Sequence, residues 1–222
     1  NPDQTNSGAL DYNTRKTVSQ TQLGLAFEQA LGHGHKLELM AYGGQRQVVQ
    51  FQSITAGAQA APGSSGAVID LDRDYWGWNA RWRHEQDWQG GRLSVSAGVA
   101  SDHQSDSRKG YENFNLVNGK PSYGLKGALR RDENNTLWNV DPYLQVSWQF
   151  LPTWRLDSGV RYSNVHYKSK DHYLSNGNDS DKTDYNKVLP SAALSWQILP
   201  ELLAYTSYAK GFETPTFTEM AY

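Results

Sequence analysis

Residues 136–162, TLWNVDPYLQVSWQFLPTWRLDSGVRY, alternate between apolar and polar side chains. Along residues 138–150 every second side chain is apolar, and the side chains between them are polar. Residues 151–153 interrupt this alternation, which resumes over residues 154–162. A period of two places each set of side chains on its own face of an extended strand. The segment therefore predicts an antiparallel hairpin with one apolar face and one polar face.

Aromatic side chains mark the ends of both predicted strands. Trp138, Trp148, Trp154 and Tyr162 lie near strand ends, with aliphatic residues between them. A strand that covers a soluble core tends to present Val, Ile and Leu instead. Aromatic rings at both ends of an apolar band, opposite a polar face that includes Arg, are typical of a lipid-exposed barrel wall around an aqueous lumen.

Composition excludes several other classes of protein. Only 37% of the 222 residues are hydrophobic, and no window approaches the roughly 20 consecutive apolar residues of a membrane helix. The 8 Trp, 13 Tyr and 20 Gly suit strands and turns. A net charge of -2 without a basic stripe argues against nucleic-acid binding. The absence of Cys removes zinc-thiolate sites, disulfides and cysteine nucleophiles, and it fits an envelope location.

The same alternation recurs along the rest of the chain and predicts about eight strands in total. The further strands are expected at residues 17–31, 36–52, 70–85, 93–100, 187–198 and 202–212. Short turns are expected near His33, Gln89, Pro152 and Pro200, and long polar loops at residues 53–69, 104–135 and 168–185. Short turns on one rim and long loops on the other are the asymmetry of an outer-membrane barrel.

An open sheet of these strands would not be stable in lipid. Its edge strands, at residues 17–31 and 202–212, would expose unpaired N–H and C=O groups, each costing several kcal/mol. A closed eight-stranded barrel has a lumen that its own side chains fill. The inward set expected here is bulky: Arg81, Arg83, Tyr143, Gln145, Arg155 and Arg161. The sequence of residues 218–222 also predicts no finished strand. We therefore expect an all-β, antiparallel transmembrane β-barrel segment that belongs to a larger barrel.

Several stretches resemble TonB-dependent outer-membrane receptors. The last strand and its exit, YTSYAKGFETPTFT at residues 205–218, resemble a strand-and-loop signature of this family. Four other stretches resemble further barrel segments of the family in the same order, namely TRKTVSQTQLG at 14–24, KGYENF at 109–114, GLKGALRRDEN at 124–134 and residues 151–162.

The resemblance implies a barrel of about 22 strands with a plugged lumen. It implies as partners an N-terminal plug domain, the TonB complex of the inner membrane, outer-membrane lipid and a scarce solute, most often a ferric siderophore. It also implies a place in the outer membrane of a Gram-negative bacterium. No plug domain or energy-coupling box is recognisable in the sequence. Residues 1–222 are therefore expected to be a partial barrel domain that lacks the plug and the remaining strands.

Candidate ligand-binding residues cluster in the loop predicted between residues 104 and 135. They are Arg108, Lys109, Tyr111, Arg130 and Arg131. Clustered cations with aromatic rings on the outer rim could hold an anionic ferric chelate by charge-assisted hydrogen bonds and ring contacts. Two alternatives remain open: a solvated loop partly neutralised by Asp132 and Glu133, or a loop that binds lipopolysaccharide phosphates.

Four arginines belong to the polar face of the predicted strands: Arg81, Arg83, Arg155 and Arg161. In a barrel this face lines the lumen. We expect these side chains to pair with acids of the plug or with Asp141 and Asp157 of the wall.

No sequence motif indicates catalysis, a cofactor or a metal. His33 and His35 have the spacing of a weak chelate but lie in a tight turn without a carboxylate. No G-x-S-x-G motif occurs. The preferred function is an active-transport receptor, not an enzyme. The alternatives are a passive pore, a structural or adhesin barrel, and a receptor for a non-iron cofactor.

Overall fold

The computed structural model describes residues 8–213. Its main sheet has eight antiparallel strands, each paired with its neighbour along the chain except for one inserted hairpin. The strands are β1 (Arg15–Gly32), β2 (His35–Phe51), β3 (Val68–Trp88), β4 (Gly91–Tyr111), β7 (Leu129–Leu151), β8 (Trp154–Asp171), β9 (Asp181–Leu199) and β10 (Leu202–Ala209). The expected fold, a segment of an antiparallel transmembrane β-barrel, is confirmed.

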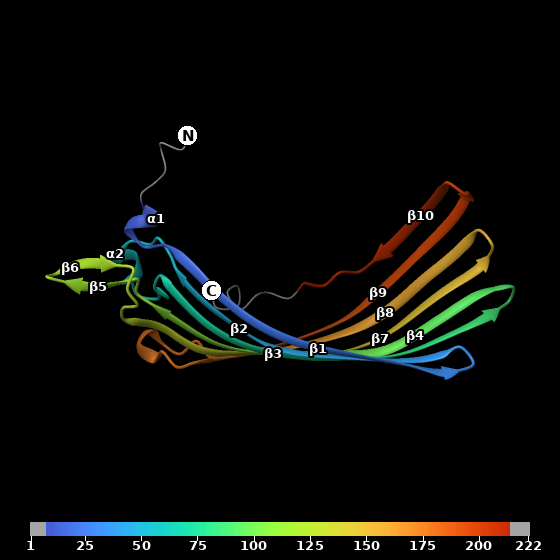
Figure 1. Ribbon diagram of the computed structural model, residues 1–222, viewed down its shortest axis with the longest axis horizontal. Coiled ribbons are helices and arrows are strands. Elements are labelled where there is room, and N and C mark those ends of the chain that lie inside the picture. The colour runs from blue at the N-terminus through green and yellow to red at the C-terminus, as the bar shows by residue number, and fades with distance from the viewer. Residues whose placement is uncertain (1–7, 214–222) are drawn as a thin grey trace.

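The sheet bends into a trough that is open along β1 and β10 (Figure 1). Its long connections lie at one end, here called the loop end, and comprise residues 8–14, 52–67, 112–128 and 172–180. Its short turns lie at the other end, the turn end, at residues 33–34, 89–90, 152–153 and 200–201. The predicted segregation of short and long connections is therefore confirmed. Among residues 8–213 no helix is long and apolar enough to span a bilayer.

Two of the short turns have a backbone that matches strand twist. His33 and Gln89 both have φ of 49°, and each is followed by a glycine with φ of 77°. Two successive residues with positive φ form a type I′ turn, whose twist agrees with that of the flanking strands. The register of the β3–β4 pair continues from its turn without a shift, whereas the β1–β2 register shifts by one residue between Ala30 and Gly32.

Cross-strand register assigns each strand residue to one face, because directly opposed side chains point the same way. Trp76, His103, Trp138 and His166 form one row, and Arg81, Gly98, Tyr143 and Arg161 form a row on the opposite face. We name the face of the first row the outer face and that of the second row the inner face.

The apolar members of every predicted strand share the outer face. The row Trp82, Ala97, Leu144 and Val160 belongs to this band. Among residues 8–213 no layer of protein covers this band, since Trp76 is 48% exposed and Leu144 is 43% exposed. The buried hydrophobic side chains of the described residues are few and gather at the loop end, and they are Val48, Phe51, Ala67, Val68, Phe114 and Tyr167. The outer face is therefore an apolar surface without a core, as a lipid-facing wall requires.

Two predicted loops are shorter in the structure than the sequence indicated. Nearly half of residues 104–135 belongs to the main sheet, since β4 continues to Tyr111 and β7 begins at Leu129. Likewise, β8 and β9 occupy much of residues 168–185. The reason is physical: beyond the lipid band both faces of the sheet are wet, so the apolar alternation ends while the backbone pairing continues. The predicted loops are wrong at these positions.

Several short elements lie at the loop end. They are α1 (Gly8–Asp11), α2 (Ala56–Gln59), the 3-10 turn η2 (Leu174–Asn176) and a separate hairpin of β5 (Phe114–Val117) and β6 (Lys120–Tyr123). The last predicted strand, residues 202–212, ends at Ala209. Residues 214–218 of the family-like signature and residues 218–222 lie outside the described part of the chain.

A fully buried asparagine ties three of these connections together. The Asn113 side-chain amide donates to the Tyr12 carbonyl at 2.8 Å and to the Gln52 carbonyl at 3.1 Å, and its oxygen accepts from the Gly124 amide at 2.9 Å. The Asn113 backbone N–H donates to Gln59 Oε1 at 2.6 Å. Because each polar atom of this side chain has a partner, the connections are held in one arrangement.

Candidate functional site

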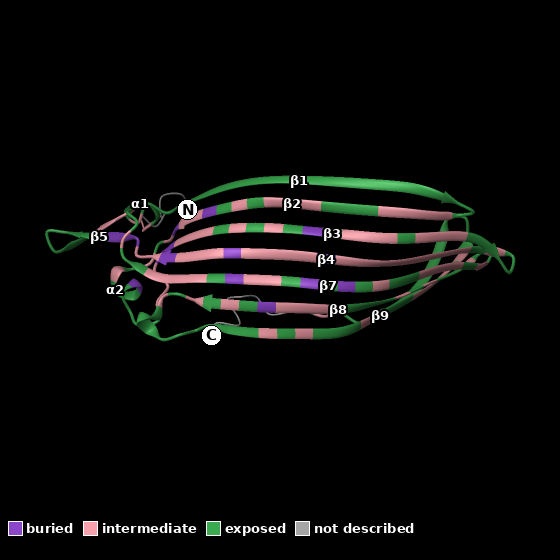
Figure 2. Cartoon of the chain, turned by 90° about the horizontal axis from the view of Figure 1, so that it is seen from below, coloured by how far each residue is buried: buried purple, intermediate pink, exposed green. Residues whose placement is uncertain are grey.

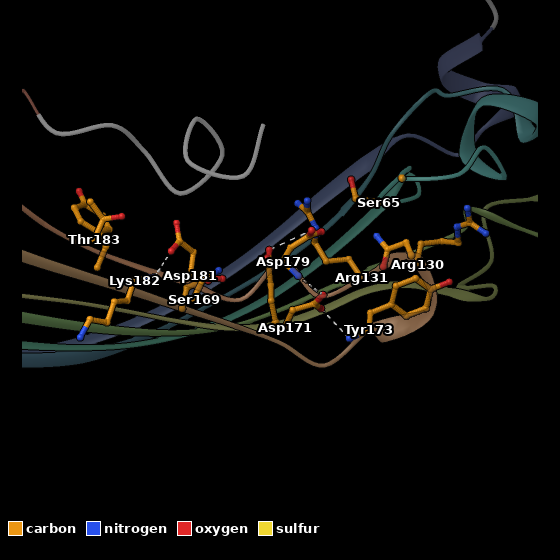
Figure 3. Close-up of a pocket in the computed structure, with 15 residues that line it drawn as sticks. Ser65, Arg130, Arg131, Ser169, Asp171, Tyr173, Asp179, Asp181, Lys182 and Thr183 are labelled. Carbon is orange, nitrogen blue, oxygen red and sulfur yellow. Dashed lines mark hydrogen bonds and ion pairs between the residues drawn. The ribbon is translucent and has the colours of Figure 1, made fainter.

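A pocket lies on the inner face at the loop end, where β7, β8 and β9 run side by side (Figure 3). It encloses about 780 Å³ of space, part of it open to solvent. Its walls include strand residues and two of the long connections. The lining residues are Gly63, Ser65, Arg130, Arg131, Glu133, Asn135, Tyr167, Ser169, Asp171, Tyr173, Asn176, Asp179, Asp181, Lys182 and Thr183.

Strand periodicity sends alternate side chains into this pocket. Arg131, Glu133 and Asn135 come from β7, and Asp181 and Thr183 come from β9. In Figure 3 Asp181 and Thr183 rise above the sheet, while the side chain of Lys182 between them descends on the other side. Sequence reasoning proposed Arg131 but not the other four as ligand-binding residues, because it treated residues 104–135 and 168–185 as loop. The period of two in YKSKD and DKTD would have been the usable signal.

Two guanidinium groups share one carboxylate beside the pocket. Glu133 Oε1 lies 3.5 Å from Arg131 Nε and 3.7 Å from Arg108 Nη1. The exposed fractions of these side chains are 12% for Glu133, 15% for Arg131 and 22% for Arg108. Partial burial limits screening by solvent, so the attraction between Glu133 and the two arginines is weakened less than it would be at a fully exposed site.

Asp171 shapes the far wall of the pocket. Its Oδ1 accepts a hydrogen bond from the Tyr173 amide at 2.8 Å, and its Oδ2 accepts one from the Asp179 amide at 3.2 Å. The Asp171 amide in turn donates to Ser180 Oγ at 2.9 Å. Asp171 thus folds the β8–β9 connection over the pocket, which is a structural role.

The five residues proposed from sequence to bind ligand do not all lie in one cluster. Arg130 and Arg131 line the pocket, and Arg108 reaches it through Glu133. Lys109 is adjacent to Arg108 on β4 and therefore belongs to the outer face. The Arg130 guanidinium donates from Nη2 to the Ala61 carbonyl at 2.7 Å.

The ring of Tyr111, the fifth candidate, is in contact with a neighbouring lysine. The Lys126 ammonium lies 4.2 Å from the centroid of the Tyr111 ring, and it also forms an ion pair with Asp70. Partial burial lowers the pKa of Lys126, but the hydrogen bond and charge of Asp70 outweigh that effect, so the pKa is raised above its usual value. This lysine stays charged and covers the ring.

The four lumen arginines are each paired with an acid of the wall. Arg155 Nη2 lies 2.8 Å from Asp157 Oδ1, and Arg161 Nη2 lies 2.6 Å from Asp141 Oδ2, as the sequence indicated. The other two pairs are Arg81 with Glu38 and Arg83 with Glu85. Contacts of these arginines with a plug domain stay a prediction. Within residues 8–213 no three His, Cys, Asp or Glu side chains come together as a metal site.

A sheet with an uncovered apolar outer face, a polar inner face and segregated connections defines a wall of a transmembrane β-barrel. A model of the TonB-dependent receptor-like β-barrel family matches residues 1–222. The chain belongs to this family.

Solved structures of similar fold support the same assignment. The unliganded ferric citrate transporter FecA matches with a TM-score of 0.76 and 15% identity, over 93% of this chain and 29% of FecA. The siderophore receptor PiuA from Acinetobacter baumannii matches with a TM-score of 0.73 and 15% identity, over 89% of this chain and 33% of PiuA. The copper transporter OprC matches with a TM-score of 0.56 and 14% identity, over 90% of this chain and 30% of OprC. The chain thus spans about a third of the length of these proteins, and the likeness concerns the fold.

Proposed function

We propose that this chain is part of the barrel wall of an active-transport receptor in the outer membrane of a Gram-negative bacterium. The division of the sheet into an apolar outer face and a polar inner face carries this proposal. In this arrangement the loop end faces the cell exterior and the turn end faces the periplasm. The solute binds near the loop end of the inner face, and the wall acts as scaffold.

The solute we propose is a ferric siderophore. Two of the similar structures are a ferric citrate transporter and a siderophore receptor. The pocket offers guanidinium groups, tyrosine and serine hydroxyls and an asparagine amide, which are hydrogen-bond donors for an oxygen-rich chelate. Arg108, Lys109, Tyr111, Arg130 and Arg131 remain the proposed ligand-binding residues. The proposal is best supported for Arg130 and Arg131, which line the pocket, and for Arg108, which shares Glu133 with Arg131.

Energy for transport would come from the TonB complex acting on a plug domain inside the barrel. Arg81, Arg83, Arg155 and Arg161 lie on the inner face and are the proposed contacts of that plug. Because each of them already has a wall carboxylate, a plug contact would extend an existing ion pair.

Growth on defined iron sources tests the ligand. A strain that lacks the full-length gene is grown with single ferric siderophores as the iron source, with and without that gene restored. We expect rescue on at least one siderophore. For a siderophore that restores growth, the double variant Arg108→Gln/Arg131→Gln should weaken binding by at least about a hundredfold, since each of the two residues would lose a charge-assisted hydrogen bond that contributes about 1.5–3 kcal/mol.

The matched control is Lys120→Gln, which removes one positive charge from the exposed β5–β6 hairpin and should leave uptake unchanged. Uptake should also stop when the TonB complex is deleted. Continued uptake in that strain would identify a passive pore instead. If the gene restored growth on a non-iron cofactor and on no ferric siderophore, the proposal of a ferric siderophore as solute would be wrong. The proposal of active transport would still hold.

A further inference from the structure

Three lysines form a cationic group on the outer face at the loop end. Lys168 of β8 lies directly opposite Lys182 of β9 in the strand register, and Lys170 follows Lys168 on the same face. All three side chains are exposed. None of them forms an ion pair with another residue of the described range 8–213. Like charges directly opposed across two strands destabilise the pair, so an anion bound between them would reduce their electrostatic repulsion.

The lysines lie at a defined height relative to the apolar band. The outer-face row immediately below them is Trp76, His103, Trp138 and His166. Within it the rings of Trp76 and His103 stack with centroids 5.1 Å apart, and those of Trp138 and His166 stack at 3.9 Å. Tryptophan rows of this kind mark the interface between lipid tails and headgroups. Lys168 is two residues beyond His166 on β8, a distance of about 7 Å along the strand. The lysines therefore lie at the level of the headgroups.

The acids near these lysines do not neutralise them. Asp184, one row below, lies 2.6 Å from His166 Nδ1. Asp132 is opposite Lys109 on the neighbouring pair of strands. The cross-strand partners of Lys168 and Lys170 on β7 are Thr136 and Asn134, which are neutral hydrogen-bonding side chains.

The remaining outer-face acids at this end are Asp70, Asp72 and Asp74 on β3. They are three strand spacings from β8, about 14 Å away.

Lys182 is one of the residues that line the pocket on the inner face, but its ammonium group points away from that pocket. Figure 3 shows the Lys182 side chain below the sheet, on the side away from Asp181 and Thr183. Its ammonium group therefore faces the surroundings of the barrel and not the transported solute.

We propose that Lys168, Lys170 and Lys182 bind the phosphate groups of phosphorylated lipid in the outer leaflet of the membrane. Each ammonium group donates charge-assisted hydrogen bonds to phosphate oxygens, and the Trp138 and His166 rings below contact the glycan and upper acyl region of the same lipid. Basic residues at an anionic membrane surface each strengthen binding, and the effect weakens as salt rises. This inference requires the barrel to sit in the outer membrane but is independent of which solute it transports.

Lipid titration of the full-length receptor tests the site. The receptor is purified in a mild detergent, stripped of lipid and titrated with diphosphoryl lipid A, with bound lipid counted by native mass spectrometry. The variant Lys168→Gln/Lys170→Gln/Lys182→Gln should bind on the order of a hundredfold more weakly at low salt. The matched control neutralises three other lysines, Lys120, Lys187 and Lys210, and should bind as the wild type does.

Heat-dependent mobility on gels verifies that each variant is folded. If the triple variant does not fold, Lys168→Gln alone should weaken binding about fivefold. Three results would overturn the proposal: equal binding by the wild type and the triple variant, equal binding of lipid A from which both phosphates have been removed, or inorganic phosphate binding as tightly as the lipid. The last result would identify a site for free phosphate.

Discussion

On the inner face the ring of Tyr143 lies over Gly98 of the neighbouring strand. A Cβ atom added to Gly98 would lie 2.5 Å from Tyr143 Oη and 2.7 Å from the carbonyl oxygen of Ala80. Tyr143 Oη also donates a hydrogen bond to Asn79 Oδ1 at 3.1 Å. The glycine therefore makes room for a ring that links three strands.

We expect Gly98→Ala to destabilise the barrel by about 1–3 kcal/mol, because overpacking must move the tyrosine or the strand backbone. Thermal unfolding of the full-length receptor, followed by gel mobility, measures this change. The control is Gly43→Ala on the outer face, where an added Cβ would meet only ordinary contacts, 3.6 Å from Trp76 Cβ. Equal melting temperatures for the two variants would contradict the role of Gly98.

A second residue-scale prediction concerns Asn113. The variant Asn113→Ala leaves the partly buried carbonyls of Tyr12 and Gln52 without this donor, and an unsatisfied group costs up to about 1–3 kcal/mol where it is buried. We expect faster hydrogen exchange and proteolysis within residues 112–128, with the membrane strands unchanged. The exposed Asn115→Ala serves as control. Unaltered exchange in Asn113→Ala would show that the three connections are held by other contacts.

At the level of elements, the β5–β6 hairpin is independent of the wall. Its strands pair only with each other, from Phe114 opposite Tyr123 to Val117 opposite Lys120. We expect that replacing residues 115–122 by Asn-Gly leaves the melting temperature of the receptor within a few degrees, since Phe114 and Tyr123 still close the hairpin. A large fall in melting temperature would show that the hairpin supports the wall.

Sequence alone predicted the parts of the strands that cross lipid, but not the parts of the same strands that continue beyond the lipid. Alternation along residues 138–150 identified a strand because one face meets an apolar solvent. Near Ser169 and Asp181 both faces meet water, so no contrast between faces remains and the strands were taken for loop. The pocket lies in this region. Arg131 was therefore recognised as a candidate by its charge, Glu133 only as a partner that neutralises such cations, and Tyr167 not at all.

At the scale of the whole molecule, the two edges of the sheet require partners. Every residue of β1 and of β10 is exposed, and Figure 2 shows β1 in the exposed colour along its whole length. Unpaired backbone groups at an edge in lipid are too costly to persist. We propose that further strands of the same barrel pair with β1 and β10, which agrees with a sheet that covers about a third of the matched receptors.

The central claim is that one face of this sheet meets lipid and the other meets an aqueous lumen. Consecutive positions 144–147 of β7 test it directly, because Leu144 and Val146 belong to the outer face and Gln145 and Ser147 to the inner face. Since the chain contains no Cys, single cysteines can be introduced there and spin-labelled in the full-length receptor in liposomes. We predict that labels at 144 and 146 collide with oxygen and are shielded from a water-soluble nickel chelate, and that labels at 145 and 147 show the reverse. Accessibility without a period of two, or with the two sets exchanged, would contradict the account.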